Sequence, residues 1–496
     1  MHNDSIEHTL VKVNLPGGVI SVGDLDGTLE CLKHIGVEEV RLGARQQLYF
    51  YVCAEQLQEL EYALLNQELS YEIGQDAHPN IVSSYVTDSI FSQQPWIREG
   101  VYRDVLDSFN FLPKLKINVV DSTQSLVPYY TGNLNFITSE IGNYWYLYLR
   151  FPTTTIFYLW SSLVYSDDIA MLSRTLEPTL LKESVSTAEE GGRLGARLEE
   201  IATKSGQFMF QPLTQPFVEP SFKLPYYEGF NGYHDRLWLG VYKRSEVFSI
   251  SFLQDICAVC KQNRIGQIYT TPWKSIIIKE IQPAIRAEWD LILDRHRVNL
   301  RHALNELNWQ TEDYGSTGLA LKQDLVHDLN RLDVRTYKLS FGIKMCDRTG
   351  VWGAVILRFL SSDGTKTWFQ VLHTRDFNPN SKDLIVYRSR VERADLSEAI
   401  VQLCEEFYAY KEVIAQRVVC PEPTAAVIEE QWLSPVVYQC PKCKTIYHPH
   451  WGDVQQGIAP KTAFKALPVD YQCSLCGTAK DSFLPFDKSL EIPHSD

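Results

Sequence analysis

Four cysteines near the end of the chain constrain its fold more than any other feature. Cys440 and Cys443 form one Cys-x2-Cys pair, and Cys473 and Cys476 form a second pair 29 residues later. Two cysteines at this spacing on a tight turn direct both thiolates at one ion, and two such turns complete a tetrahedron. Four thiolates suit either zinc or iron, so the spacing alone leaves a zinc ribbon and an iron site as alternatives.

The sequence around these pairs resembles rubredoxin. The similar stretches are YQCPKCKTIYHPHWGD, GIAPKTAFKALP and DYQCSLCGTAKDSF, separated by loops of the lengths found in that family. The aromatic residues that match the family's core beside the iron are Tyr438, Tyr447, Phe464, Tyr471 and Phe483. The resemblance implies a domain over residues 437–487, preceded by a linker at 419–436, with one mononuclear iron cycling between Fe2+ and Fe3+. Zinc remains possible in the same four-cysteine site.

The first cysteine pair departs from the rubredoxin pattern at one position. Lys444 stands where the family usually has glycine, whereas the second pair retains Gly477. A non-glycine residue in a left-handed turn costs about 1 kcal/mol, which a metal-locked turn tolerates. Lys442 and Lys444 lie beside a site that becomes more negative on reduction. We expect them to favour the reduced form and to orient docking on an acidic partner; the alternative is that they are ordinary solvated lysines.

The rest of the 496-residue chain is too long for one hydrophobic core, so we expect several domains. Strand and helix patterns alternate in residues 9–75 and recur in the same order in residues 236–295. Expected helices lie near 22–35 and 54–65 in the first unit and near 246–263 and 282–296 in the second. We interpret this as an internal duplication within an α+β, multidomain fold. Residues 144–165 read as buried strands, and 170–206 as helical with two glycine-rich breaks.

Three stretches of this large region resemble the sulfite and nitrite reductase family, which uses sirohaem coupled to a four-iron cluster. They are VRLGARQQLYF (40–50), LPKLKINVVD (112–121) followed by GNLNFI (132–137), and TTPWKSIII (270–278). The resemblance implies two ferredoxin-like halves at 9–95 and 226–299, and two reductase-like α/β domains at 96–225 and 300–418. Matched position by position, the residues that could still bind an anion or a tetrapyrrole are Arg41, Arg45, Lys114 and Lys116.

The cluster ligands of that family are missing from the matching positions. The family supplies them as Cys-x5-Cys and Cys-x3-Cys. Thr311 and Thr317 align with the first pair, and Cys346 and Gly350 align with the second. One cysteine cannot hold a cubane, so we expect neither a four-iron cluster nor sirohaem, and the region is a degenerate reductase.

The remaining cysteines are scattered, which indicates a reducing compartment, and we expect a cytoplasmic protein. Cys257 and Cys260 fall on an expected helix, where they are either buried thiols or a redox pair. The net charge of −14 argues against nucleic acid as a partner. The most apolar stretch is interrupted by Arg150 and Pro152, so we expect no membrane insertion.

These observations predict an iron-binding electron-transfer protein. Its reductase-like body would dock a redox partner, such as a nitrite or sulfite reductase, and an upstream donor would supply the electrons. We predict no catalytic residue. The alternatives are a sirohaem-binding oxidoreductase acting on nitrite or sulfite, and a zinc-loaded scaffold protein.

Overall fold

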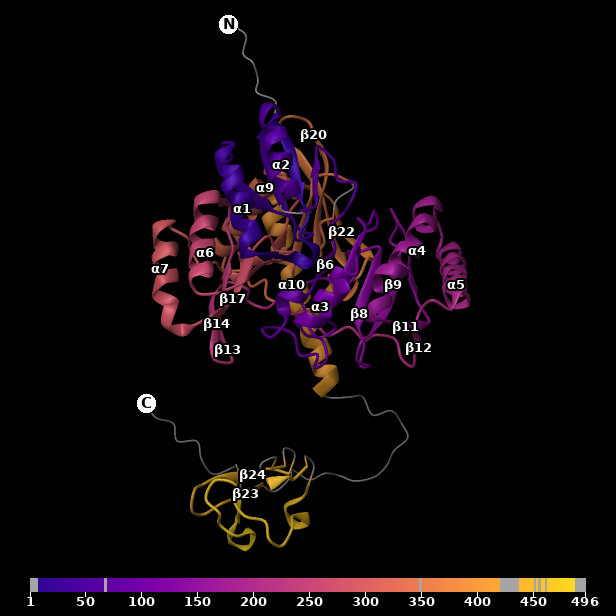
Figure 1. Cartoon of the computed structure of the whole chain (residues 1–496). Helices are drawn as coiled ribbons and strands as arrows, with labels where there is room; N and C mark the ends of the chain where they lie inside the picture. Colours follow the sequence, from indigo (N-terminus) through magenta and orange to yellow (C-terminus); the bar gives the residue numbers. More distant parts are fainter. Residues whose placement is uncertain are drawn as a thin grey trace. The chain divides into compact units, whose positions relative to one another are not determined.

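The computed structural model consists of two compact units, and the boundary between them in the sequence falls between Val413 and Ile414. The structure describes residues 8–66, 69–347, 350–419, 437–449, 452–453, 456–459 and 462–486. The first unit, the body, combines helices with four sheets, and the second is a small domain built on a short sheet (Figure 1). This confirms the α+β, multidomain class, whereas the limits of the individual domains within the body remain predictions.

The body contains two copies of one arrangement of strands and helices. The first copy comprises β1 (His8–Val13), β2 (Val19–Ser21), α1 (Val22–His34), β3 (Glu39–Leu42), β4 (Leu48–Cys53), α2 (Leu57–Asn66) and β5 (Tyr71–Ile73). The second comprises β13 (Gly229–Tyr233), β14 (Arg236–Val241), β15 (Val247–Ser249), α6 (Ile250–Gln262), β16 (Gln267–Thr270), β17 (Ile276–Ile281) and α7 (Arg286–Arg295). Serine caps equivalent helices in both copies: Ser21 Oγ accepts from the N–H of Asp24, and Ser249 Oγ from that of Phe252. The predicted duplication is therefore confirmed.

The two copies exchange strands. The strand orders are β15-β3-β4-β1-β5 and β13-β14-β17-β16-β2, so each copy contributes one strand to the sheet of the other. The helix expected at 246–263 therefore begins only at Ile250, because residues 247–249 form an edge strand that pairs with β3. Helices α1 and α6 pack against each other, and one continuous core includes side chains of both copies. The copies are thus interlocked.

The region between the two copies forms a sheet of seven strands. These are β6 (Val82–Ser83), β7 (Ile117–Val120), β8 (Leu134–Thr138), β9 (Tyr144–Arg150), β10 (Phe157–Leu159), β11 (Ser162–Tyr165) and β12 (Phe210–Pro212). Its helices are α3 (Glu99–Asp107), α4 (Ile169–Lys182) and α5 (Ala188–Ser205). Strands β9, β10 and β11 confirm the strands predicted for 144–165; β9 and β11 contribute buried side chains, whereas those of β10 are half-buried.

The prediction of glycine-rich breaks in residues 170–206 was wrong. Helix α5 continues through its glycines because two of them let it approach the sheet closely. A Cβ at Gly195 would lie 2.3 Å from the Tyr158 ring, and one at Gly191 would lie 2.7 Å from Ile156. The helix boundary falls earlier, where Thr187 caps α5 through a capping box with Glu190.

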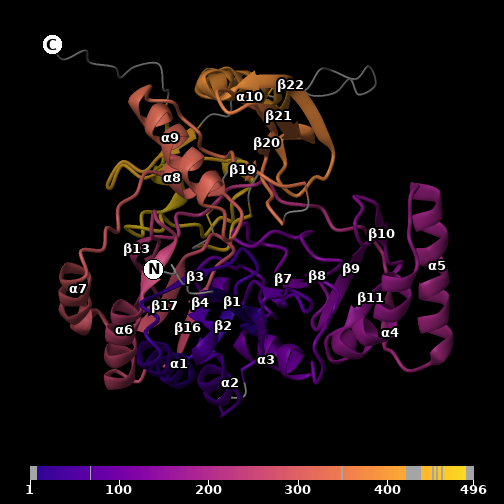
Figure 2. The same cartoon turned by 90° about the horizontal axis from the view of Figure 1, so that it is seen from above.

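A second region of similar design follows the second copy. It comprises α8 (Leu304–Leu307), β18 (Trp309–Gln310), α9 (Ser316–Arg331), β19 (Phe341–Lys344), β20 (Val355–Ser362), β21 (Thr367–Thr374), β22 (Leu384–Glu392) and α10 (Leu396–Val419). The sheet order is β18-β19-β20-β21-β22. Strands β18, β19 and β20 are parallel and β21 is antiparallel, which is the pattern of β6, β7, β8 and β9 in the first region. Figure 2 shows α9 and α10 near this sheet.

The C-terminal domain has a three-stranded sheet ordered β24-β23-β25. The strands are β23 (Val437–Gln439), β24 (Ile446–Tyr447) and β25 (Leu484–Phe486). The aromatic core predicted for this domain is confirmed: Tyr447, Phe464, Tyr471 and Phe483 are buried together, and the Tyr438 ring stacks on Phe464 at 3.9 Å. Residues 420–436 of the predicted linker and the predicted last residue, 487, lie outside the described residues.

None of the helices in the described part of the chain combines the length and the apolar character needed to cross a membrane.

Candidate metal centre and basic cluster

The four cysteines lie on two turns of the same design, which we call the first metal turn (residues 440–445) and the second metal turn (residues 473–478). In the first, the N–H of Cys440 donates to the carbonyl of Thr445 at 2.8 Å, and the N–H of Lys444 donates back to Cys440 at 3.0 Å. Lys444 has φ of 64°, so it occupies the left-handed conformation that the sequence predicted. The turn therefore keeps its geometry despite the missing glycine.

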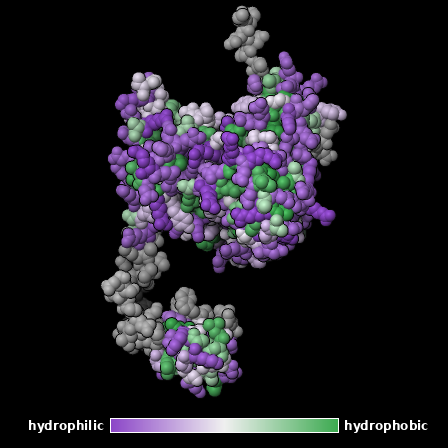
Figure 3. Space-filling model, turned by 90° about the vertical axis from the view of Figure 1, so that its left-hand side faces the viewer, coloured by the Kyte–Doolittle hydropathy of each residue, from purple (hydrophilic) through white to green (hydrophobic). Residues whose placement is uncertain are grey.

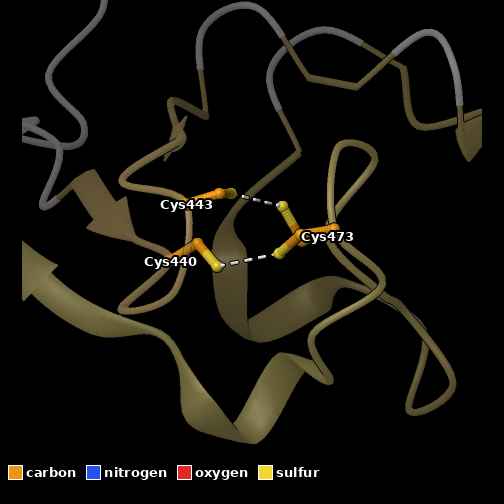
Figure 4. A group of neighbouring side chains, drawn as sticks. Cys440, Cys443 and Cys473 are labelled. Atoms are coloured by element: carbon orange, nitrogen blue, oxygen red, sulfur yellow. Dashed lines mark hydrogen bonds between the residues drawn. The ribbon is translucent and has the colours of Figure 1, made fainter.

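The second metal turn repeats this pattern. Cys473 donates to the carbonyl of Thr478 at 2.8 Å, and Gly477, with φ of 68°, donates to Cys473 at 2.9 Å. The two turns face each other with their cysteine side chains between them (Figure 4). The local sequence of each turn is thus sufficient to aim two sulfurs at one point.

The four Sγ atoms all lie within 4.8 Å of one another. Cys440 Sγ is 3.5 Å from Cys476 Sγ, and Cys443 Sγ is 3.4 Å from Cys473 Sγ. A tetrahedron with metal–sulfur bonds of about 2.3 Å places its sulfurs roughly 3.8 Å apart, so this arrangement fits one ion. Within the residues that the structure describes, these cysteines form the one group of histidine, cysteine or carboxylate side chains able to hold a metal.

Backbone N–H groups point at the inner sulfur of each turn. Burial raises the pKa of Cys440, but the N–H groups of Cys443 and Lys442 outweigh it and lower that pKa to about 6. Burial dominates at Cys473 and raises its pKa to about 11, although the N–H groups of Leu475 and Cys476 act in the opposite direction. A bound ion would deprotonate both thiols outright. The N–H groups would then stabilise the thiolates.

Two threonines contact the sulfurs from outside the ligand set, and the sequence reasoning missed them. Thr445 Oγ1 is 3.0 Å from Cys443 Sγ, and Thr478 Oγ1 is 3.0 Å from Cys476 Sγ. The repeated pattern Cys-x2-Cys-x-Thr is the signal in the sequence that could have revealed them.

Comparison with known proteins agrees with this geometry. The sequence model of the rubredoxin family matches residues 437–483. Probable Rubredoxin-1 of Methanocaldococcus jannaschii is 41% identical over 57 residues, which are 11% of this chain and 71% of that protein. Through this domain, the chain belongs to the rubredoxin family. The High molecular weight rubredoxin of Moorella thermoacetica is 50% identical over 46 residues, which are 9% of this chain and only 20% of that protein.

The body is similar in structure to a different protein. The structure of the Mycobacterium tuberculosis NirA protein matches 85% of this chain and 86% of its own length, with a TM-score of 0.65 and 15% identity. At this identity the likeness shows that the two chains share a fold, and it agrees with the multidomain α+β class predicted for the body.

Of the four cations predicted in the body, Arg45 and Lys116 lie close together. Arg45 donates to the carbonyls of Asn80 at 2.7 Å and Ile117 at 3.0 Å. Burial and the nearby Arg150 lower the pKa of Arg45 to about 9. Burial, Arg45 and Arg150 lower the pKa of Lys116 to about 8.

Further cations adjoin this pair. Burial, Arg150 and Lys344 lower the pKa of Lys382 to about 7. Burial, Arg358 and Arg150 also lower the pKa of Lys344. We call these residues the basic cluster: Arg45, Lys116, Arg150, Lys344, Arg358 and Lys382. The sequence reasoning noted Arg150 only as an interruption of an apolar run, although a cation inside such a run is itself a signal of a functional position.

Arg41 and Lys114 lie apart from the basic cluster. Arg41 lines a cavity of about 330 Å³ together with Tyr49, Tyr51 and Tyr314. Lys114 is exposed, and its backbone N–H donates to Glu177 at 2.7 Å. Their predicted role in anion binding remains a prediction.

The basic cluster adjoins an aromatic cavity of about 420 Å³. Tyr130, Tyr148 and Phe157 contribute their rings to its lining. The charged groups of the lining are two cations, Lys382 and Arg375, and two carboxylates, Glu219 and Asp376. Tyr130 contacts the other two rings at centroid distances of 5.1 and 5.4 Å. The rings suit a planar ligand, and positive charge next to the cavity comes from Lys382 and the rest of the basic cluster.

The two segments aligned with the family's cluster cysteines do lie side by side. The carboxylate of Glu312 accepts from the N–H groups of Met345 at 2.8 Å and Cys346 at 2.9 Å. Thr311 is buried, and its hydroxyl contacts the ammonium of Lys274 at 3.2 Å. Hydroxyl, carboxylate and ammonium groups thus occupy this junction, and these residues do not fit a four-iron cluster.

The cysteine pair at 257 and 260 lies on α6, one turn apart, as predicted. Both side chains are fully buried. Burial raises the pKa of the Cys257 thiol to about 12 and raises that of Cys260 as well. Thiols of this kind are poor nucleophiles, so the structure favours buried core cysteines over a redox pair.

Proposed function

We propose that this chain is an iron-binding electron-transfer protein whose rubredoxin domain carries one electron at a time. The observation that carries the proposal is the convergence of four Sγ atoms on two matched turns with N–H groups aimed at the sulfurs. Four thiolates suit both Fe2+ and Fe3+, so the iron exchanges an electron with little rearrangement. Zinc in this site would make the domain a structural scaffold instead.

Protein purified from its native host is expected to contain about one iron per chain. Its oxidised form should be red, and one electron should bleach it. Metal quantification and an ultraviolet–visible redox titration on the same sample would check this. Colourless protein with only zinc would contradict the proposal.

We further propose that the body docks a redox partner of the nitrite or sulfite reductase type, while an upstream donor reduces the rubredoxin domain. Support comes from the reductase-like fold combined with a junction that lacks cluster ligands, because such a body retains reductase architecture without the electron relay. A cytoplasmic location agrees with the ten described cysteines, none of which forms a disulfide.

The edge of the metal site is suited to an acidic partner. Lys442 and Lys444 are exposed within the first metal turn. Leu475 in the second metal turn is 71% exposed and offers an apolar contact beside the ion. Figure 3 shows hydrophobic patches among hydrophilic side chains on the C-terminal domain. The lysines would attract an acidic partner and orient it as it approaches. Burial of the apolar contact would then stabilise the complex.

The double variant Lys442→Glu/Lys444→Glu is expected to slow electron transfer to a nitrite or sulfite reductase of the same host by about tenfold or more at low salt. The difference from the unmodified protein should shrink as ionic strength rises, because salt screens exposed charges. Stopped-flow measurement of the return of the red colour, starting from the reduced protein at several salt concentrations, would measure it. Lys465→Glu, outside both metal turns, is the control; an equal effect of this variant would contradict directed docking.

A second candidate function is a sirohaem-binding oxidoreductase acting on nitrite or sulfite. The basic cluster and the adjoining aromatic cavity favour it, because cations next to ring faces suit an anionic tetrapyrrole. Arg150 and Lys382 would hold its carboxylates. The same spectrum separates the two candidates: tetrapyrrole bands, and a pigment extractable from the protein, would support the second.

A further inference from the structure

The hydroxyls of Thr445 and Thr478 occupy matching places in the two metal turns. Each follows the outer cysteine of its turn by two residues and lies 3.0 Å from that cysteine's sulfur. Each threonine also closes its turn through its carbonyl, which accepts from the inner cysteine at 2.8 Å. Because the carbonyl bond fixes the backbone, the hydroxyl is held next to the sulfur in both turns.

Metal binding fixes the direction of these contacts. A thiol could donate to a hydroxyl, but a metal-bound thiolate has no proton and can only accept. The Thr445 hydroxyl can then only donate to Cys443, and the single proton of the Thr478 hydroxyl has two sulfurs of the site as acceptors. In the described part of the chain, the other contact of these hydroxyls is that of Thr478 with Cys440, a second sulfur of the same site.

Donated hydrogen bonds affect the two oxidation states unequally. Four thiolates with Fe3+ carry a net charge of −1, and with Fe2+ the charge becomes −2. A donor next to sulfur stabilises the more negative state more strongly, and hydrogen bonds to charged groups are stronger than neutral ones. Hydrogen bonds to the sulfurs are one of the features by which a protein sets the potential of such a centre.

We propose that Thr445 and Thr478 are positioning residues whose hydroxyls donate to Cys443 and Cys476 and raise the reduction potential of the metal centre. The inference rests on the proposed iron function and adds a second kind of donor to the backbone N–H groups. It also gives the two half-buried sulfurs, which are nearer to solvent than Cys440 and Cys473, a fixed hydrogen-bond partner.

The test compares Thr445→Val, Thr478→Val and the double variant, each as the full chain loaded with iron in vitro. Valine keeps the shape of threonine and the backbone N–H while removing the hydroxyl. At a fixed applied potential, we expect the ratio of reduced to oxidised iron to fall about threefold for each single variant and about tenfold for the double variant. Tenfold corresponds to 59 mV for a one-electron couple. The charge-transfer bands of the oxidised form should move to longer wavelength.

Two further variants make the result specific. Thr445→Ser retains an O–H and should restore most of the potential. Thr462→Val is the matched control, because the Thr462 hydroxyl donates to the carbonyl of Ala459 and not to a sulfur. An iron-loaded, red double variant with unchanged potential and unchanged bands would overturn the inference. Native protein without iron would count against the proposed function, while the iron-loaded variants would still decide the role of the hydroxyls.

Discussion

Replacing Cys473 by serine is expected to abolish tight iron binding and to unfold the rubredoxin domain while the body stays folded. Cys473 is buried, 3% exposed, and lies in the centre of the domain's small core. Ion binding supplies much of the folding energy of such small metal domains, on the order of 10 kcal/mol. Loss of one of four ligands should reduce iron retention more than about 100-fold, which exceeds the effect of losing an outer-shell partner. Metal analysis and visible absorbance would measure this.

Calorimetry of the same variant should show the transition of the body at its original temperature, because the two compact units divide between Val413 and Ile414. Cys346→Ser is the matched control. That thiol is exposed and lies on the segment aligned with the missing cluster, so iron content and colour should not change. A Cys473→Ser protein that keeps a stable red centre would contradict the four-cysteine site.

Replacing Glu246 by alanine is expected to destabilise the body by about 3–5 kcal/mol. Glu246, Lys274 and Lys322 are all buried, and the carboxylate oxygens lie 2.7 Å from Lys274 Nζ and 3.2 Å from Lys322 Nζ. Without the carboxylate, the buried Lys322 loses the carboxylate it pairs with, and Lys274 keeps only the longer ion pair with Asp313 at 3.6 Å. Urea unfolding followed by tryptophan fluorescence would measure the loss.

The same carboxylate makes the stability of the body depend on pH. Burial acts to raise the pKa of Glu246, but Lys274 and Lys322 outweigh it and lower that pKa to about 2. A lowered pKa in the folded state means that the stabilisation is present above the ordinary value near 4.5 and is lost as pH falls from there towards 2. The alanine variant should therefore lose less stability on acidification over this range than the unmodified protein.

An exposed ion pair provides the control for Glu246. Glu200 pairs with Lys204 on the surface of α5, where solvent screens the charges, so Glu200→Ala should change stability far less than Glu246→Ala. If the two glutamate variants had similar small effects, the buried network would not be the stabilising element that the structure indicates.

Much of the metal site could be predicted from the sequence because each half of it is local. The spacing of Cys440 and Cys443, and of Cys473 and Cys476, determines two tight turns whose hydrogen bonds span at most five residues. The same locality places Thr445 and Thr478 beside the sulfurs. The duplicated strand and helix patterns could also be predicted, because the hydrophobic periodicity that reveals them lies within single elements.

The tertiary structure decided which distant residues meet. Strands β2 and β15 are too short for the sequence to predict which strand each one pairs with. Only the folded body shows that each joins the sheet of the other copy. Likewise, Arg150, Lys344 and Lys382 come from separate segments, and the packing of two sheets brings them together while Arg41 and Lys114 lie apart. A turn is specified by neighbours in sequence, whereas a shared cluster depends on long-range packing, and no single stretch of this chain encodes that packing.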